Sequence, residues 1–144
     1  MSDQTIKLIA AGVLLLHGLG HGGAIGALAW IRFRPGSPTG DWLAARSWLV
    51  PSLAGDTATT LAIAFWLVAL VGFVIAAMSF WGVVIPGNVW RPVAVASALV
   101  SIAGITFFFG TWPMFNTIAA MAVNVAVLAA VLWLRWPSQA MLGS

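Results

Sequence analysis

Four long apolar segments constrain the fold of this chain more than any other feature. They run approximately over residues 6–31, 57–85, 92–111 and 113–134. A bilayer core about 30 Å thick is crossed by roughly 20 residues of helix, so each segment is long enough to span it. Hydrocarbon cannot satisfy an open backbone, and the alternation typical of barrel strands is absent, so we expect helices. The predicted fold is an all-α, membrane-spanning four-helix bundle, with residues 1–144 as one domain.

The composition agrees with a membrane environment and excludes several functions. The chain is 62% hydrophobic and only 6% charged, with a mean hydropathy of +1.05, whereas soluble domains carry about a quarter charged residues. Its six basic and three acidic residues are too few and too scattered for a nucleic-acid surface, so the expected partner is the lipid bilayer. Cysteine is absent, which excludes disulfides, iron–sulfur clusters and thiolate metal sites.

The connections between the segments predict the topology. Proline-containing loops join the second segment to the third and the third to the fourth, so we expect antiparallel neighbours and both termini on the same side. The first connection is longer, and its stretch DWLAARSWLV, residues 41–50, carries Asp41 as a helix cap and two tryptophans. This pattern predicts a short helix in the membrane interface.

The first segment and the loop charges bear on insertion. Ala27 and Ala29 resemble a signal cleavage site, but the preceding apolar stretch is too long for a cleaved signal, so we expect a retained span. Basic residues in the loops usually set orientation. Here the basic residues predict neither orientation, because three fall on each side. The side of the termini has Lys7, Arg91 and Arg135, and the opposite side has Arg32, Arg34 and Arg46.

The chain places its only two histidines in the stretch VLLLHGLGHGGAIG, residues 13–26. His17 and His21 are one helical turn apart and therefore share a face. Glycines at four-residue spacing, Gly18, Gly22 and Gly26, predict a ridge against which another helix packs closely. An alternative role of the glycines is to make space for a flat cofactor.

A buried imidazole requires hydrogen-bond partners, and the other spans offer few. Ser101 lies in the third segment, and Asn124 is at the midpoint of the fourth. We therefore predict a polar cluster of His17, His21, Ser101 and Asn124 near the midplane, with Ser97 and Thr117 at its margin.

This predicted cluster fits several functions. Histidine and asparagine side chains can recognise the polar group of a small amphiphilic ligand, lipid or membrane partner. The alternative is a metal- or haem-dependent redox protein or enzyme that uses the His17/His21 pair. Two histidines at i and i+4 can bind a divalent metal, but such a site lacks further ligands, and one helix cannot clamp a haem from both faces within a monomer. A Ser101–His21 dyad, a purely structural cluster that fixes helix register, an accessory-subunit role and a homo-oligomer all stay open. We expect binding rather than catalysis.

Sequence motifs in all four segments together suggest a family. They are LLLHGLGHGGAIG in the first, LAIAFWLVALVGF in the second, SALVSI followed by FFFGTW in the third, and NTIAAMAVNVAVL in the fourth. In order and spacing these resemble uncharacterised small bacterial four-transmembrane-helix proteins with an N-terminal H-G-x-x-H helix, broadly DoxX-like. The resemblance implies a bacterial inner-membrane location and an association with redox or accessory membrane roles, and it draws attention to the predicted polar cluster. It implies no particular reaction.

Overall fold

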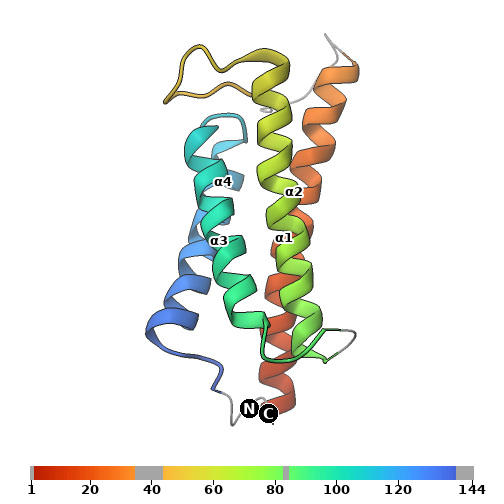
Figure 1. The fold of residues 1–144 in the computed structure, drawn as a ribbon, viewed down its shortest axis with the longest axis vertical. Helices are drawn as coiled ribbons and strands as arrows, with labels where there is room; N and C mark the ends of the chain where they lie inside the picture. The colour runs from red at the N-terminus through yellow and green to blue at the C-terminus, as the bar shows by residue number, and fades with distance from the viewer. Residues whose placement is uncertain (1, 35–43, 83–84, 139–144) are drawn as a thin grey trace.

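The structure, a computed structural model, describes residues 2–34, 44–82 and 85–138. Its helices are α1 (Asp3–Phe33), α2 (Gly55–Phe80), α3 (Trp90–Phe107) and α4 (Met114–Leu128), and α4 continues into the π-helical turn η1 (Ala129–Trp133). They run alternately up and down, so that α1 begins and η1 ends at the same end of the bundle, here called the terminal end (Figure 1). When α4 and η1 are counted as one helix, four helices are long and apolar enough to cross a membrane. The predicted all-α fold with four membrane-spanning helices is confirmed.

Two of the predicted segments extend beyond the helices that they contain. The second was expected to reach residue 85, but α2 ends at Phe80, and Gly82 follows with φ +63°. The third was expected to reach residue 111, but α3 ends at Phe107, and Gly110 has φ +85°. Glycine adopts this left-handed conformation without a Cβ penalty and commonly follows a helix end. Apolar sequence continues past both helix ends, and hydropathy alone therefore misplaces them.

The interfacial helix predicted over residues 41–50 is wrong for its described part, residues 44–50, while residues 41–43 lie outside the described chain. Instead the backbone reverses direction: the Ser47 amide donates to the Leu53 carbonyl at 2.8 Å, and the Leu53 amide donates to the Val50 carbonyl at 2.8 Å. An isolated antiparallel bridge also forms just outside this turn.

Two local effects oppose a helix in this stretch. Pro51 disfavours the helical conformation of the residue before it, Val50. The Ser47 hydroxyl accepts a hydrogen bond from the Val50 amide at 3.1 Å, so a side chain takes up a donor that a helix would use. Trp48 then donates to the Thr106 carbonyl, which attaches this turn to the end of α3.

The glycine ridge of α1 packs against α2 over part of its length. A Cβ at Gly18 would lie 3.0 Å from the Cβ of Phe73, and one at Gly22 would lie 3.8 Å from a methyl group of Leu70. A Cβ at Gly26 would meet no described atom within 4 Å, so its predicted packing role is wrong as far as the described residues are concerned. Residues at four-residue spacing drift by about 40° per step around a helix, and Gly26 has therefore turned away from α2.

Helices α2 and α3 also approach each other through a glycine. A Cβ at Gly72 would overlap the hydroxyl of Ser97, which itself donates to the Val93 carbonyl at 2.7 Å. The space left by the missing side chain at position 72 is therefore filled by the serine hydroxyl, which brings the two backbones close together.

We predict that Gly72→Ala destabilises the protein by about 1–3 kcal/mol, because the added methyl group overpacks this contact. Adding Ser97→Ala removes the overlapping hydroxyl and should recover most of the loss. Unfolding in detergent, followed by circular dichroism, measures both. Gly26→Ala is the matched control and should leave stability nearly unchanged. Equal losses for Gly72→Ala with and without Ser97→Ala would contradict this packing.

Candidate functional site

The buried apolar side chains form two clusters, and polar residues lie between them along the helices. The cluster nearer the terminal end includes Leu14 on α1, Ala98 on α3 and Val127 on α4. The other includes Ala24 on α1 and Ile105 on α3. Three buried polar residues lie between the two clusters, one on each of α1, α3 and α4: His21, Ser101 and Asn124. The polar layer is therefore enclosed by apolar packing on both sides.

Four side chains in this layer form one continuous series of hydrogen bonds, here called the polar chain. His17 Nε2 lies 2.8 Å from Asn124 Oδ1. Asn124 Nδ2 donates to Ser101 Oγ at 2.7 Å, and Ser101 Oγ lies 3.1 Å from His21 Nε2. The predicted contacts among His17, His21, Ser101 and Asn124 are present. They join α1 to both α3 and α4.

The directions of these bonds assign the imidazole protons. Asn124 Oδ1 only accepts, so His17 must carry its proton on Nε2. Ser101 Oγ accepts from Asn124, and in the described structure His21 Nε2 is the one hydrogen-bond acceptor that the Ser101 hydroxyl has, so we assign the hydroxyl proton to the bond with His21. His21 then carries its proton on Nδ1. Every bond runs in the same direction, an arrangement in which each bond polarises the next.

His21 is almost completely enclosed, at 1% exposure. Its ring is parallel to that of Phe73, with centroids 6.2 Å apart, and lies 5.6 Å from the ring of Trp112. Phe73 also meets the His17 ring edge-on at 4.7 Å. Helix α2 therefore contributes an aromatic wall but no polar partner. Within the described chain, His21 Nδ1 has no hydrogen-bond partner.

The two residues predicted at the margin do not join the polar chain. Ser97 donates to the Val93 carbonyl, as described above, and Thr117 donates to the Pro113 carbonyl at 3.2 Å. Serine and threonine hydroxyls in helices often bond the carbonyl four residues earlier, which satisfies them within their own helix. Both side chains are buried, but neither contacts a histidine through a hydrogen bond in the described structure.

A cleft lies between α1 and α4 and contains two neighbouring cavities. One, of about 240 Å³, is here called the polar cavity, because both histidines and Asn116 line it together with Trp112. The other, of about 220 Å³, is lined almost entirely by apolar side chains and is here called the apolar cavity. Val123 lines both. The cleft therefore has a polar part and an apolar part that share one lining residue of α4.

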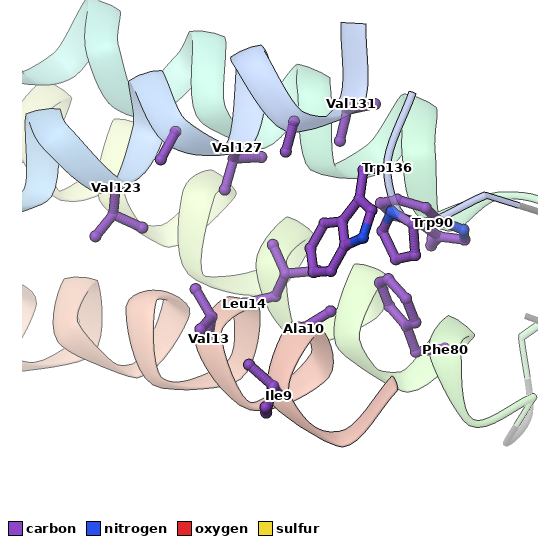
Figure 2. Close-up of a pocket in the computed structure, with 13 residues that line it drawn as sticks. Ile9, Ala10, Val13, Leu14, Phe80, Trp90, Val123, Val127, Val131 and Trp136 are labelled. Atoms are coloured by element: carbon purple, nitrogen blue, oxygen red, sulfur yellow. The ribbon is translucent and has the colours of Figure 1, made fainter. Parts of the chain in front are cut away.

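The apolar cavity extends toward the terminal end of the bundle. Figure 2 shows Leu14 of α1 and Val127 of α4 on opposite walls, with Trp136 reaching across from the segment that follows η1. The Trp136 amide donates to the Ala130 carbonyl at 2.8 Å, and Arg91 donates to the Pro137 carbonyl at 2.6 Å. These bonds hold the segment after η1 against this end of the cavity.

Sequence reasoning missed the apolar cavity and the contribution of Asn116. Asn116 is a polar residue in the first turn of α4, where an aqueous boundary explains it equally well. The apolar lining residues have the same character as lipid-facing or core residues, so no sequence signal distinguishes them. The missed features depend on the distance between α1 and α4.

The donor set gives the metal hypothesis no support. The described residues contain no group of three or more His, Cys, Asp or Glu side chains that could hold an ion. Both Nε2 atoms of the pair already take part in the polar chain. Asp56 is 80% exposed and pairs with Arg32 at 3.6 Å, away from the histidines.

The geometry also gives little support to a Ser101–His21 nucleophilic dyad. The distance of 3.1 Å between Ser101 Oγ and His21 Nε2 suits proton transfer from the serine hydroxyl to the imidazole. However, Ser101 is fully buried, Asn124 donates to the same oxygen, and Ser101 is not among the residues that line the polar cavity. The hydroxyl is therefore positioned as a link between two side chains.

Comparison with known proteins adds no further evidence: no family model, curated protein or solved structure matches this chain. The resemblance to DoxX-like four-helix proteins therefore stays a prediction.

We predict two different histidine tautomers in the folded protein. Because the chain has only two histidines, ¹⁵N-histidine labelling gives one pair of ring nitrogens for each. The His17 ring should be protonated on Nε2 and the His21 ring on Nδ1, as read from ¹⁵N chemical shifts and assigned with His17→Gln. A His21 ring protonated on Nε2 would contradict the assigned direction of the polar chain.

Proposed function

We propose that this protein binds a small amphiphile in the cleft between α1 and α4. The polar group of the ligand occupies the polar cavity beside His17 and His21, and its apolar chain lies in the apolar cavity. The observation that carries this proposal is that a polar and an apolar cavity lie side by side and share Val123 as a lining residue. A binding site for an amphiphile requires one polar and one apolar compartment in contact.

The size and lining of the cleft support this function. Ligand pockets usually have volumes of about 300–1,000 Å³. Each cavity alone is smaller, at about 240 and 220 Å³, but together they fall within this range. Membrane-spanning helices form both walls, so the ligand is one that partitions into the bilayer.

The cellular setting of the proposal rests on the resemblance. We place the protein in the bacterial inner membrane with both termini on one side, as expected for small DoxX-like four-helix proteins. The ends of the described chain lie together at the terminal end, which agrees with this topology (Figure 1).

Photolabelling tests the proposal. The probe is a long-chain fatty alcohol with a diazirine at mid-chain, added to the protein in nanodiscs, and labelled peptides are mapped by mass spectrometry. We expect labelling of the α1 and α4 residues that line the apolar cavity. Val123→Trp should reduce this labelling at least about tenfold, because an indole fills the junction between the cavities.

The matched control is Leu132→Trp, further along the same helix in η1, where the side chain is 61% exposed and lines neither cavity. It adds the same indole to a surface outside the cleft and should leave labelling unchanged. Labelling confined to the outer faces of the helices, or equally affected by both variants, would show that the polar chain has only a structural role.

A further inference from the structure

The polar chain ends in a hydrogen-bond donor that has no acceptor. The bond directions leave the proton of His21 on Nδ1, and this atom is buried without a partner in the described chain. A buried unsatisfied donor is costly, and more so in a bilayer, where no solvent replaces the missing bond. His21 also lines the polar cavity, while Nδ1 itself is covered by neighbouring side chains, so a small rotation of the ring is needed for an acceptor bound in the cavity to complete the chain.

The described lining of the polar cavity offers no charge with which to balance a charged ligand. None of the lining residues in the described part of the chain is Asp, Glu, Lys or Arg. Among the described basic residues, Arg32 pairs with Asp56 beyond the cavity, and Arg91 donates to carbonyls of the segment after η1. A charged head group at this depth would be buried without a counter-charge, which is strongly unfavourable.

The apolar cavity restricts the rest of the ligand. Side chains from α1 and α4 form its opposite walls, and Trp136 limits it toward the terminal end (Figure 2). Its volume of about 220 Å³ accommodates one chain rather than the two chains of a typical phospholipid.

Given the proposed function, we infer that the ligand is an uncharged, single-chain carbonyl compound, such as a long-chain ketone, aldehyde or ester. Its carbonyl oxygen accepts the hydrogen bond of His21 Nδ1–H. The polar chain then has a complete set of donors and acceptors, from His17 through Asn124 and Ser101 to His21 and the ligand.

Competition against the photoreactive alcohol tests this inference. The competitors have the same chain length and differ only in the head: 2-tridecanone, tridecane, and a tridecyl trimethylammonium salt. We expect the ketone to displace the probe at concentrations about tenfold lower than either of the others. Equal displacement by ketone and alkane would overturn the inference, as would stronger displacement by the ammonium salt.

A second measurement avoids substitutions in the site. Adding 2-tridecanone to ¹⁵N-histidine-labelled protein should shift the His21 Nδ1 resonance, while the His17 Nε2 resonance changes much less. Addition of tridecane should produce neither change. An unchanged His21 Nδ1 signal at saturating ketone would overturn the assignment of this atom as the donor.

The outcomes separate this inference from the proposed function. If the alcohol labels the cavities but the ketone has no advantage, the binding site stands and the assigned head-group chemistry is wrong. If the alcohol does not label the cavities at all, the proposed function itself is wrong.

Discussion

The hydrogen bond between His17 and Asn124 is the direct polar link across the cleft between α1 and α4 in the described structure. In water such a bond exchanges with solvent and contributes little. Between helices in a bilayer, an imidazole or amide has no solvent to replace its lost partner, and each such bond contributes about 0.6–2 kcal/mol. From Asn124 the polar chain continues through Ser101 to His21. Its position therefore determines how α1 is aligned with α3 and α4.

Close packing of α1 against α2 and of α2 against α3 fits the position of the polar chain. Gly18 allows α1 to approach α2, and Gly72 allows α2 to approach α3. No comparable glycine contact brings α1 to α4 among the described residues; there the larger side chains of Leu14 and Val127 line a cavity. The unequal spacing explains why α1 and α4 are separated by cavities, whereas α1 and α2, and α2 and α3, are in close contact at these glycines. Binding, in this account, depends on a gap that the polar chain spans without filling.

The sequence predicts the polar chain well because polar residues are rare in the spans. His17, Ser101 and Asn124 lie at comparable depths, and an imidazole in hydrocarbon has few alternatives, so their contacts follow from satisfaction of hydrogen bonds. Ser97 shows the limit of this reasoning, since a serine can satisfy itself on its own helix. Gly26 shows a second limit, because regular spacing along a helix does not keep a residue on one face.

Other features depend on geometry that composition does not record. The ends of α2 and α3 depend on glycines in the left-handed conformation, within sequence that stays apolar. The turn that replaces the predicted interfacial helix depends on Ser47 and Pro51 acting together. The apolar cavity depends on the separation of α1 and α4, and its lining residues resemble those of any apolar surface.

A double-mutant cycle on His17 and Asn124 tests most directly whether the polar chain holds α1 to α4. The free energy of unfolding is measured in the same detergent for the wild type, His17→Leu, Asn124→Leu and the double variant. If the chain stabilises the bundle, each single change leaves a buried polar group without its partner, and the double change costs less than the two together. We expect a coupling of about 0.5–2 kcal/mol. Strictly additive losses, with no coupling beyond measurement error, would contradict the account.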